Sequence, residues 1–212
     1  MPIFQQIVTK ASEDRLEKLI QERVSASPEL KKEIDARVWD LFGETWSIMF
    51  TDLSGFSRNV EKFGITHFLQ IIYESHRLLV PEIDNYDGIL LKKEGDSMMI
   101  IFRKPDKAVD CAVQMQKTAA QYNSGRPDEE KILLCIGLGH GLILKIGDDD
   151  VFGAEVNAAS KLGEDTAKSG EILVTGSMME ILSERKDLSF EMLENIPPGA
   201  QSSYLLKSAE HP

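Results

Sequence analysis

The pattern of apolar and polar positions divides the chain near residue 45. Residues 1–45 are rich in charge and carry apolar residues at helical spacing, which predicts two amphipathic helices. Ser27 followed by Pro28 is typical of a helix N-cap and a first helical position, so we expect the second helix to begin there. The two apolar stripes are Leu16, Leu19, Ile20 and Val24, and then Leu30, Ile34, Val38 and Leu41.

Two interpretations of this N-terminal segment stay open. The helices either pack on the body of the protein, or they form a segment that dimerises or relays a signal. A coiled coil requires three heptads or more, and the stripes are shorter than that, which favours packing on the body. We therefore expect residues 1–45 to be a helical extension and residues 46–212 to be the functional domain.

From Trp46 onwards, alternating apolar runs predict strands that interleave with helices. A tight Glu-Gly-Asp turn inside 88–102 predicts a hairpin, and 131–147 reads as a strand, a glycine-rich bend and a strand. Helices and hairpins together indicate an α+β fold with a mixed or antiparallel central sheet flanked by helices. The other expected strands are 46–52, 171–176, 188–193 and 202–207, and the expected helices are 65–83 (with Phe68, Leu69, Ile72 and Leu79 on one side), 105–123, 153–170 (closed by Gly170) and 177–185.

Charge and cysteine usage restrict the partners and the compartment. The net charge of −11 argues against a nucleic-acid backbone as a partner. The two cysteines, Cys111 and Cys135, lie in apolar contexts, which predicts buried thiols in a reducing compartment. The sequence contains no secretion signal and no apolar run long enough to span a bilayer, so a cytoplasmic location is expected.

Two aspartates are candidates for chemistry. Asp52 ends the first strand of the main domain, and Asp96 lies in the turn of the predicted hairpin. If the strand lies beside the hairpin, the two carboxylates converge and bind magnesium, which takes oxygen ligands and keeps water and phosphate in its shell. The alternative is that Asp96 is an ordinary turn residue next to Gly95 and that Asp52 caps a following helix.

The segment that follows Asp52 is small and contains Gly55 and Phe56. Small residues allow backbone N–H groups to approach the phosphates of a ligand, so we expect this loop to bind substrate. The four histidines show no ligand spacing, which makes a zinc site improbable on this pattern. The stretch Gly-Leu-Gly-His-Gly at 137–141 lacks the ending of a P-loop.

Four stretches, in this order, resemble the motifs of the class III adenylate/guanylate cyclase catalytic domain. They are FTDLSGFS, LLKKEGDSMM, DVFGAEVNAASKL and GEILVTGSM, and the resemblance covers about residues 46–183. It implies a central β-sheet flanked by helices and a homodimer with active sites at its interface. It also implies conversion of a nucleoside triphosphate to a cyclic 3′,5′-monophosphate and pyrophosphate.

The resemblance assigns metal ligands to this sequence. Asp52 and Asp96 match the two metal-binding aspartates, and the Leu53 carbonyl adds a ligand. The implied cofactor is Mg²⁺ or Mn²⁺, with two ions at each site.

The resemblance also assigns substrate contacts. Lys92 and Asp150 match the lysine and aspartate that contact adenine in the ATP-specific members, which makes ATP the expected substrate. Asp148 and Asp149 are alternatives for the second position. Asn157 matches the asparagine that orients the ribose, and Lys161 stands where the family usually has an arginine that stabilises the transition state.

The departures from the family pattern keep other functions open. Lysine in place of arginine at 161 keeps the charge but loses the planar two-pronged donor. The segment 195–207 contains no counterpart of the lysine that holds the terminal phosphates in many relatives. One alternative is therefore a weak or inactive nucleotide-binding regulatory module, and another is a cyclase for a different nucleoside triphosphate. Alternatively, Lys92 and Lys93 have no role in substrate binding and are solvated partners of Glu94.

Overall fold

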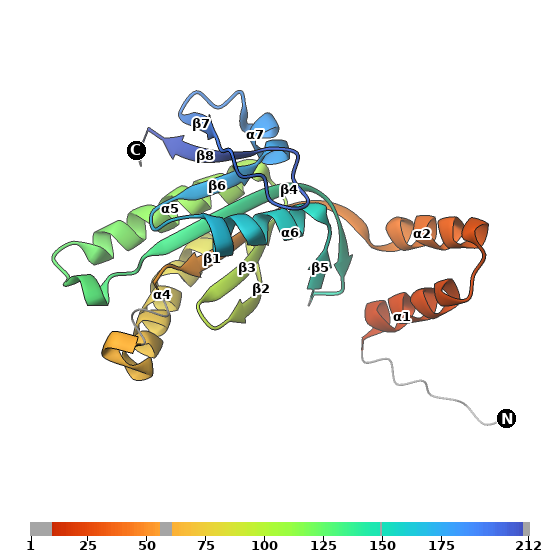
Figure 1. Cartoon of the computed structure of the whole chain (residues 1–212), viewed down its shortest axis with the longest axis horizontal. Helices are drawn as coiled ribbons and strands as arrows, with labels where there is room; N and C mark the ends of the chain where they lie inside the picture. Colours follow the sequence, from red (N-terminus) through yellow and green to blue (C-terminus); the bar gives the residue numbers. More distant parts are fainter. Residues whose placement is uncertain (1–9, 56–60, 149, 210–212) are drawn as a thin grey trace.

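The computed structural model describes residues 10–55, 61–148 and 150–209 (Figure 1). The helices are α1 (Ala11–Val24), α2 (Pro28–Phe42), α4 (Ile65–Asn85), α5 (Pro105–Asn123), α6 (Ala154–Ser160) and α7 (Gly176–Leu182), with a 3-10 turn at Asp128–Glu130 and a π-helical segment at Lys161–Thr166. The strands are β1 (Gly43–Leu53), β2 (Ile89–Glu94), β3 (Ser97–Phe102), β4 (Leu134–Ile146), β5 (Asp150–Phe152), β6 (Ile172–Thr175), β7 (Leu188–Met192) and β8 (Ser203–Ser208).

The strands form one mixed sheet in the order β2-β3-β1-β4-β6-β8-β7, with β5 paired to the far end of β4. Within the described residues, β4 and β6 pair in parallel and every other neighbouring pair is antiparallel. The predicted α+β architecture with a mixed sheet is therefore confirmed. None of the helices in the described ranges is both long and apolar enough to cross a lipid bilayer.

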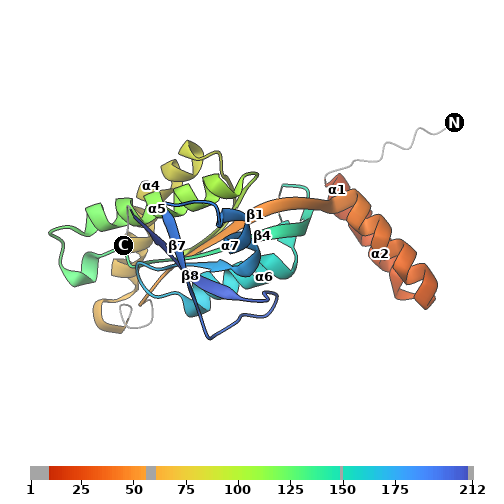
Figure 2. The same ribbon diagram turned by 90° about the horizontal axis from the view of Figure 1, so that it is seen from above.

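Strand β1 separates two apolar layers because its side chains alternate between the faces of the sheet. Met49 and Leu53 belong to the larger core, which α4 and α5 cover. Trp46 and Ile48 face the other way, into a smaller core closed by α6. Figure 2 shows α4 and α5 on one side of the sheet and α6 on the other. Asp52 lies in the same alternation as Ile48, so it reaches the α6 face.

Strand β4 is one continuous strand, and the predicted strand–bend–strand is wrong at this point. Gly137, Gly139 and Gly141 alternate with Leu138 and His140, and all three face α6 and the π-helical segment. A Cβ atom on Gly137 would lie 2.2 Å from the carbonyl oxygen of Ala159 and 2.4 Å from the backbone nitrogen of Gly163. The glycines therefore allow helical backbone to lie directly on the sheet.

We expect Gly137→Ala to destabilise the fold, because the new methyl group meets backbone atoms that no side-chain rotation can move. Overpacking of this kind costs about 1–3 kcal/mol or more. A matched control is Gly170→Ala, where a Cβ meets nothing within 4 Å and only the positive φ of +85° opposes the change. Urea unfolding monitored by circular dichroism measures both. Equal losses in the two variants would contradict the steric explanation.

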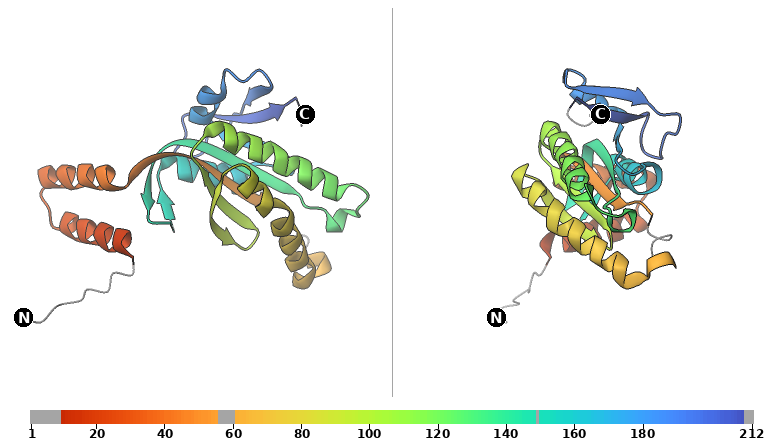
Figure 3. Two further views of the ribbon diagram at one scale, coloured as in Figure 1. Left: turned by 180° about the vertical axis from the view of Figure 1, so that it is seen from behind. Right: turned by 90° about the vertical axis from the view of Figure 1, so that its left-hand side faces the viewer.

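The N-terminal helices form an antiparallel hairpin that projects from the body (Figure 2; Figure 3, left). The predicted cap is confirmed, since the Ser27 hydroxyl accepts a hydrogen bond from the backbone nitrogen of Leu30 at 3.3 Å. Arg23 on α1 and Asp35 on α2 form an ion pair across the hairpin at 2.5 Å. The seam between the helices and the body consists of Leu19, Ile34, Val38, Phe42 and Ile146 of β4.

Three predicted burial patterns need correction. In α1, Leu19 is buried, but Ile20 and Val24 are exposed. In α2, Leu30 and Leu41 are exposed, and Phe42 fills the seam in place of Leu41 because α2 continues straight into β1 at Gly43. In α4, Phe68 and Leu79 are buried as expected, but Leu69 is exposed. The predicted helix 153–170 ends earlier, because α6 passes into the π-helical segment that stops at Thr166.

Candidate active site

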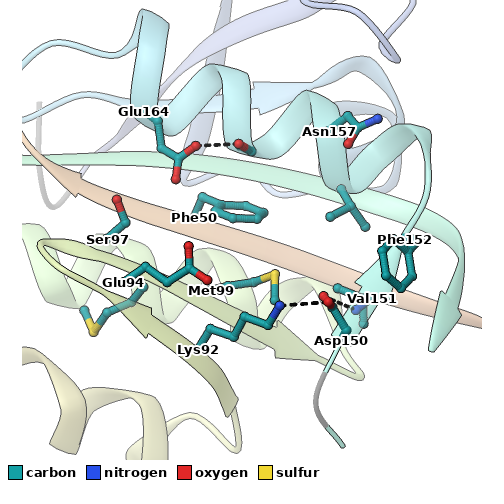
Figure 4. A pocket seen from close by; sticks show the side chains of 13 residues that line it. Phe50, Lys92, Glu94, Ser97, Met99, Asp150, Val151, Phe152, Asn157 and Glu164 are labelled. Atoms are coloured by element: carbon teal, nitrogen blue, oxygen red, sulfur yellow. Dashed lines mark hydrogen bonds and ion pairs between the residues drawn. The ribbon is translucent and has the colours of Figure 1, made fainter. Parts of the chain in front are cut away.

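A pocket of about 280 Å³ lies on the α6 face of the sheet. The β2–β3 hairpin forms one wall, α6 and the π-helical segment form the other, and β5 closes one end (Figure 4). The apolar floor is Phe50 and Met99, and the polar lining is Lys92, Glu94, Ser97, Asp150, Asn157, Ser160 and Glu164. Met98 also borders the pocket, but it belongs to the core on the opposite face of the sheet. Phe152 lies at the end that holds Asp150 and Asn157 (Figure 4), and Val156 also lines the pocket.

Lys92 and Asp150 form an ion pair at one end of this pocket, with 2.8 Å between Nζ and Oδ2. They come from β2 and β5, which are not neighbours in the sheet. A register shift between Leu90 and Lys92 places Lys92 opposite Met99, on the pocket face. Without this bulge, Lys92 would share the opposite face with Leu90, so one extra residue turns the lysine towards the pocket.

The three consecutive aspartates at 148–150 are separated by the structure. Asp150 begins β5 and lines the pocket. Asp148 pairs with Lys145 at 3.0 Å, and its side chain is 99% exposed. Asp149 lies outside the described residues. Among the two described aspartates, therefore, only Asp150 is placed to contact a ligand held by Lys92.

Asp52 and Asp96 come together at the other end of the β2–β3 hairpin. Asp52 is near the end of β1, and its Oδ1 accepts a hydrogen bond from the Ser97 hydroxyl at 3.0 Å. Burial, with the nearby negative charge of Asp96, raises the pKa of Asp52 to about 6. Burial also raises the pKa of Asp96. Burial disfavours ionisation of both acids, and the charge of Asp96 adds to this effect at Asp52, so the pair is suited to a cation that neutralises both.

The donor set fits a hard divalent cation that is shared with a ligand. In the described ranges, no three His, Cys, Asp or Glu side chains come close enough to hold a metal on their own. Magnesium and manganese can bind to so few protein ligands, because water and phosphate oxygens complete their coordination beside one or two carboxylates. Leu53 follows Asp52 in β1, and Gly55 adopts a positive φ of +93° in the turn after it. Phe56, which we expected to bind substrate, lies outside the described residues.

Asn157 and Lys161 belong to α6 and the π-helical segment, which lie opposite the hairpin. Asn157 is on the exposed side of α6 and lines the pocket. Lys161 begins the π-helical segment and pairs with Asp165 at 2.5 Å, and both side chains are more than half exposed. Asp165 raises the pKa of Lys161, mainly through this hydrogen bond. Lys161 is not among the residues that line the pocket.

Several lining residues could not be identified from the sequence. Ser97 connects the pocket to Asp52, and its only signal is its place directly after Asp96. Glu164 reaches the pocket and accepts a hydrogen bond from the Ser160 hydroxyl at 2.5 Å. Asn157, Ser160 and Glu164 are spaced i, i+3 and i+7 along the helical segment, so helical periodicity counted from Asn157 is the signal that could have identified Glu164.

Residues 43–207 match the family model described as adenylate and guanylate cyclase catalytic domain. The chain belongs to this family. The class III cyclase fold and the resemblance noted in the sequence are thereby confirmed. The domain division at residue 45 stays a prediction, although β1 begins at Gly43, directly after α2.

The relatives of this cyclase domain include adenylate cyclases. "Putative adenylate cyclase 3" of Rhizobium meliloti (strain 1021) is 28% identical over 144 residues, which are 68% of this chain and 24% of the relative. "Adenylate cyclase" of Mycobacterium tuberculosis (strain ATCC 25618 / H37Rv) is 29% identical over 195 residues, 84% of this chain and 42% of the relative. The chain thus spans less than half of these curated relatives.

A solved structure supports the same fold. The crystal structure titled adenylate/guanylate cyclase/hydrolase from Silicibacter pomeroyi has a TM-score of 0.68 and 27% sequence identity. The match covers 77% of this chain and 96% of that structure.

Proposed function

We propose that this cyclase domain converts ATP to 3′,5′-cyclic AMP and pyrophosphate at sites shared between two copies of the chain. The observation that carries the proposal is the Lys92–Asp150 pair, which lines the pocket on the face that Asp52 also reaches. The names of the adenylate cyclase relatives support it. The unpaired, buried cysteines Cys111 and Cys135 support a reducing, cytoplasmic location.

Adenine matches the lysine–aspartate pair in hydrogen-bonding pattern. The Lys92 ammonium is a donor for a ring nitrogen, and the Asp150 carboxylate accepts from the exocyclic amino group. Guanine presents an oxygen acceptor and a ring N–H donor at the corresponding edge. Bound in the same orientation, it would leave both protein groups unpaired, at a cost of about 1–3 kcal/mol for each buried group.

Asp52 and Asp96 would hold the divalent ions, together with the Leu53 carbonyl. Bound Mg²⁺ or Mn²⁺ supplies Lewis-acid stabilisation of an ionised ribose hydroxyl and of the triphosphate. The protein orients the other groups: Asn157 holds the ribose, and the backbone around Gly55 and Phe56 donates to phosphate oxygens. The 3′-oxygen then forms a bond to the α-phosphorus, and the bond from this phosphorus to the pyrophosphate oxygen breaks.

Shared sites can be tested by mixing variants. In the proposed two-fold dimer, Asp52 and Asp96 of one subunit face Lys92, Asp150 and Asn157 of the other. Asp52→Ala and Asn157→Ala are each expected to be inactive alone, and their mixture should regain one intact site per heterodimer, or about a quarter of wild-type activity after statistical exchange. Cyclic AMP is measured by chromatography. A mixture that stays inactive, although exchange is shown with differently tagged chains, would rule out sharing.

Lys161 is paired with Asp165, so its positive charge is less available to a phosphate. We expect this pairing to limit turnover. Lys161→Arg is expected to raise kcat up to ~10-fold, because guanidinium donates two parallel hydrogen bonds to a phosphate. Asp165→Asn should raise kcat by a smaller factor, since an exposed i,i+4 pair contributes little and is readily broken. Steady-state kinetics at saturating ATP measure both. Unchanged kcat in both variants would show that residue 161 does not reach the reacting phosphate.

The paired Lys161 also favours a second candidate function, a module that binds nucleotide and turns it over slowly or not at all. Incubation of the protein with each of the four ribonucleoside triphosphates and Mn²⁺ distinguishes the possibilities. Cyclic AMP alone supports the adenylate cyclase. A different cyclic nucleotide supports another base specificity, and tight binding without product supports the regulatory module.

A further inference from the structure

A carboxylate outside the pocket connects its own helix to three other elements of the fold. Glu155, in the first turn of α6, accepts hydrogen bonds at both of its oxygens. Its Oε2 accepts from the backbone nitrogen of His140 at 3.2 Å and from the Thr175 hydroxyl at 2.7 Å. Its Oε1 accepts from the Ser177 hydroxyl at 2.9 Å. One side chain thereby joins α6 to β4, to the end of β6 and to α7.

The Glu155 carboxylate lies where β6 ends and no longer pairs with β4. Alternate backbone N–H groups of β4 point towards β6, and that of Ile136 donates to the Glu171 carbonyl at 3.1 Å. The N–H of His140, four residues further on, points the same way, but β6 ends at Thr175 and turns into α7. Glu155 Oε2 occupies the place of the missing strand carbonyl, so the N–H of His140 is not left unsatisfied.

The glycine pattern of β4 provides the room for this side chain. A Cβ on Gly139 would lie 3.0 Å from Glu155 Oε2 and 2.8 Å from the Glu155 carbonyl oxygen. A Cβ on Gly141 would lie 2.9 Å from Glu155 Cγ. Glycines at 139 and 141 therefore leave room across the strand for the Glu155 side chain. This explains the glycine pattern of β4, which has no role in the proposed reaction.

The hydrogen bonds of Glu155 to His140, Thr175 and Ser177, here called the clamp, fix the helix that carries Asn157. Residues two positions apart on a helix point in nearly opposite directions, so Glu155 faces the sheet while Asn157 faces the pocket. Helix α6 has only seven residues, too few to be stable without tertiary contacts. Rotation of α6 about its axis would break the Glu155 hydrogen bonds and swing Asn157 out of the pocket at the same time.

We propose that Glu155 is a positioning residue for the reaction, which sets the rotation of α6 and hence the place of Asn157. This inference rests on the proposed function, in which Asn157 orients the ribose. Glu155 touches no substrate; it acts through the helix.

The test compares two conservative variants. Glu155→Asp shortens the side chain by one methylene and cannot reach all three donors. Glu155→Gln keeps the length and one oxygen that accepts from His140 and Thr175, and the Ser177 hydroxyl can accept from its amide nitrogen. We expect Glu155→Asp to lower kcat by ~10–100-fold with KM for ATP within ~3-fold, and Glu155→Gln to stay within ~3-fold of wild type in both. The matched control is Glu180→Asp, at an exposed carboxylate on α7.

Hydrogen exchange separates this inference from the proposed function. In nucleotide-free protein, amides of 156–160 should exchange at least ~10-fold faster in Glu155→Asp than in wild type, while those of α5 stay unchanged. This result, with loss of kcat in the folded variant and rescue by glutamine, supports positioning. Unchanged exchange at α6, or a Glu155→Gln variant as weak as Glu155→Asp, overturns it. If the wild type forms no cyclic nucleotide, the proposed function fails, and accelerated exchange at α6 still shows the clamp.

Discussion

Asp52→Asn is expected to abolish cyclic nucleotide formation and to raise the stability of the metal-free protein at pH 7.5. Activity is lost because an amide does not neutralise a divalent ion. Stability rises because the half-buried Asp52 carboxylate, next to Asp96, is unfavourable when ionised, as its raised pKa of about 6 shows. Opposite effects on activity and stability are typical of a site in which like charges are held together for function.

The pH dependence follows from the direction of this shift. The folded-state pKa of Asp52 lies above its ordinary value of 3.8, so the folded form binds the proton more tightly than the unfolded chain does. The resulting stabilisation is fully present below about pH 4 and is lost as the pH rises through about 6. The loss amounts to roughly 2–3 kcal/mol above pH 7, and Asp52→Asn should remove this part of the pH dependence.

Thermal unfolding in the presence of a chelator, from pH 4.5 to pH 7.5, measures the effect. The control is Asp84→Asn, at an exposed position on α4, which should change neither stability nor activity. Addition of Mn²⁺ at pH 7.5 should raise the Tm of the wild type and leave that of Asp52→Asn unchanged. A Tm that falls in Asp52→Asn, or a response to Mn²⁺ that survives the substitution, would contradict the assigned metal site.

Lys92→Met is expected to lower kcat/KM for ATP by ~100-fold. Methionine keeps much of the apolar stem but donates no hydrogen bond to the base, and it leaves Asp150 without its partner in the pocket. A loss of about 2.7 kcal/mol in transition-state stabilisation corresponds to this factor. Initial rates of cyclic AMP formation over a range of ATP concentrations measure it.

The adjacent lysine provides the control for this prediction. Lys93 pairs with Met98 across the hairpin and faces the other side of the sheet from Lys92. Lys93→Met therefore removes the same charge from the same strand and should keep kcat/KM within ~2-fold of wild type. If the two variants lose activity equally, the net charge of the hairpin matters and Lys92 does not contact the base.

The contrast between Lys92 and Lys93 shows where sequence reasoning stops. The hairpin and its turn were predicted from apolar alternation and from Gly95, and both are present. Simple alternation does not tell which of two consecutive lysines faces a pocket once a strand contains a bulge. The resemblance pointed to Lys92 through its distance from Asp96, and the register shift supplies the physical reason why that side chain faces the pocket.

Other features escaped prediction because they depend on contacts between distant segments. The glycines of β4 predict a bend from the sequence alone, because nothing local shows that a helix lies on the strand at Gly137. Glu155 has no signal in its own neighbourhood, because its partners lie on β4, β6 and α7. In contrast, α2 was located correctly from Ser27 and Pro28, whose effects are local.

The N-terminal hairpin is joined to the rest of the molecule without a spacer. Helix α2 ends at Phe42, and β1, which leads to Asp52, begins at the next residue. Ile146 of β4 lies in the seam of the hairpin, and Asp150 and Phe152 line a groove against α1. Under the proposed function, a movement of these two helices would therefore reach Asp52 through β1 and Asp150 through β4 and β5 at the same time.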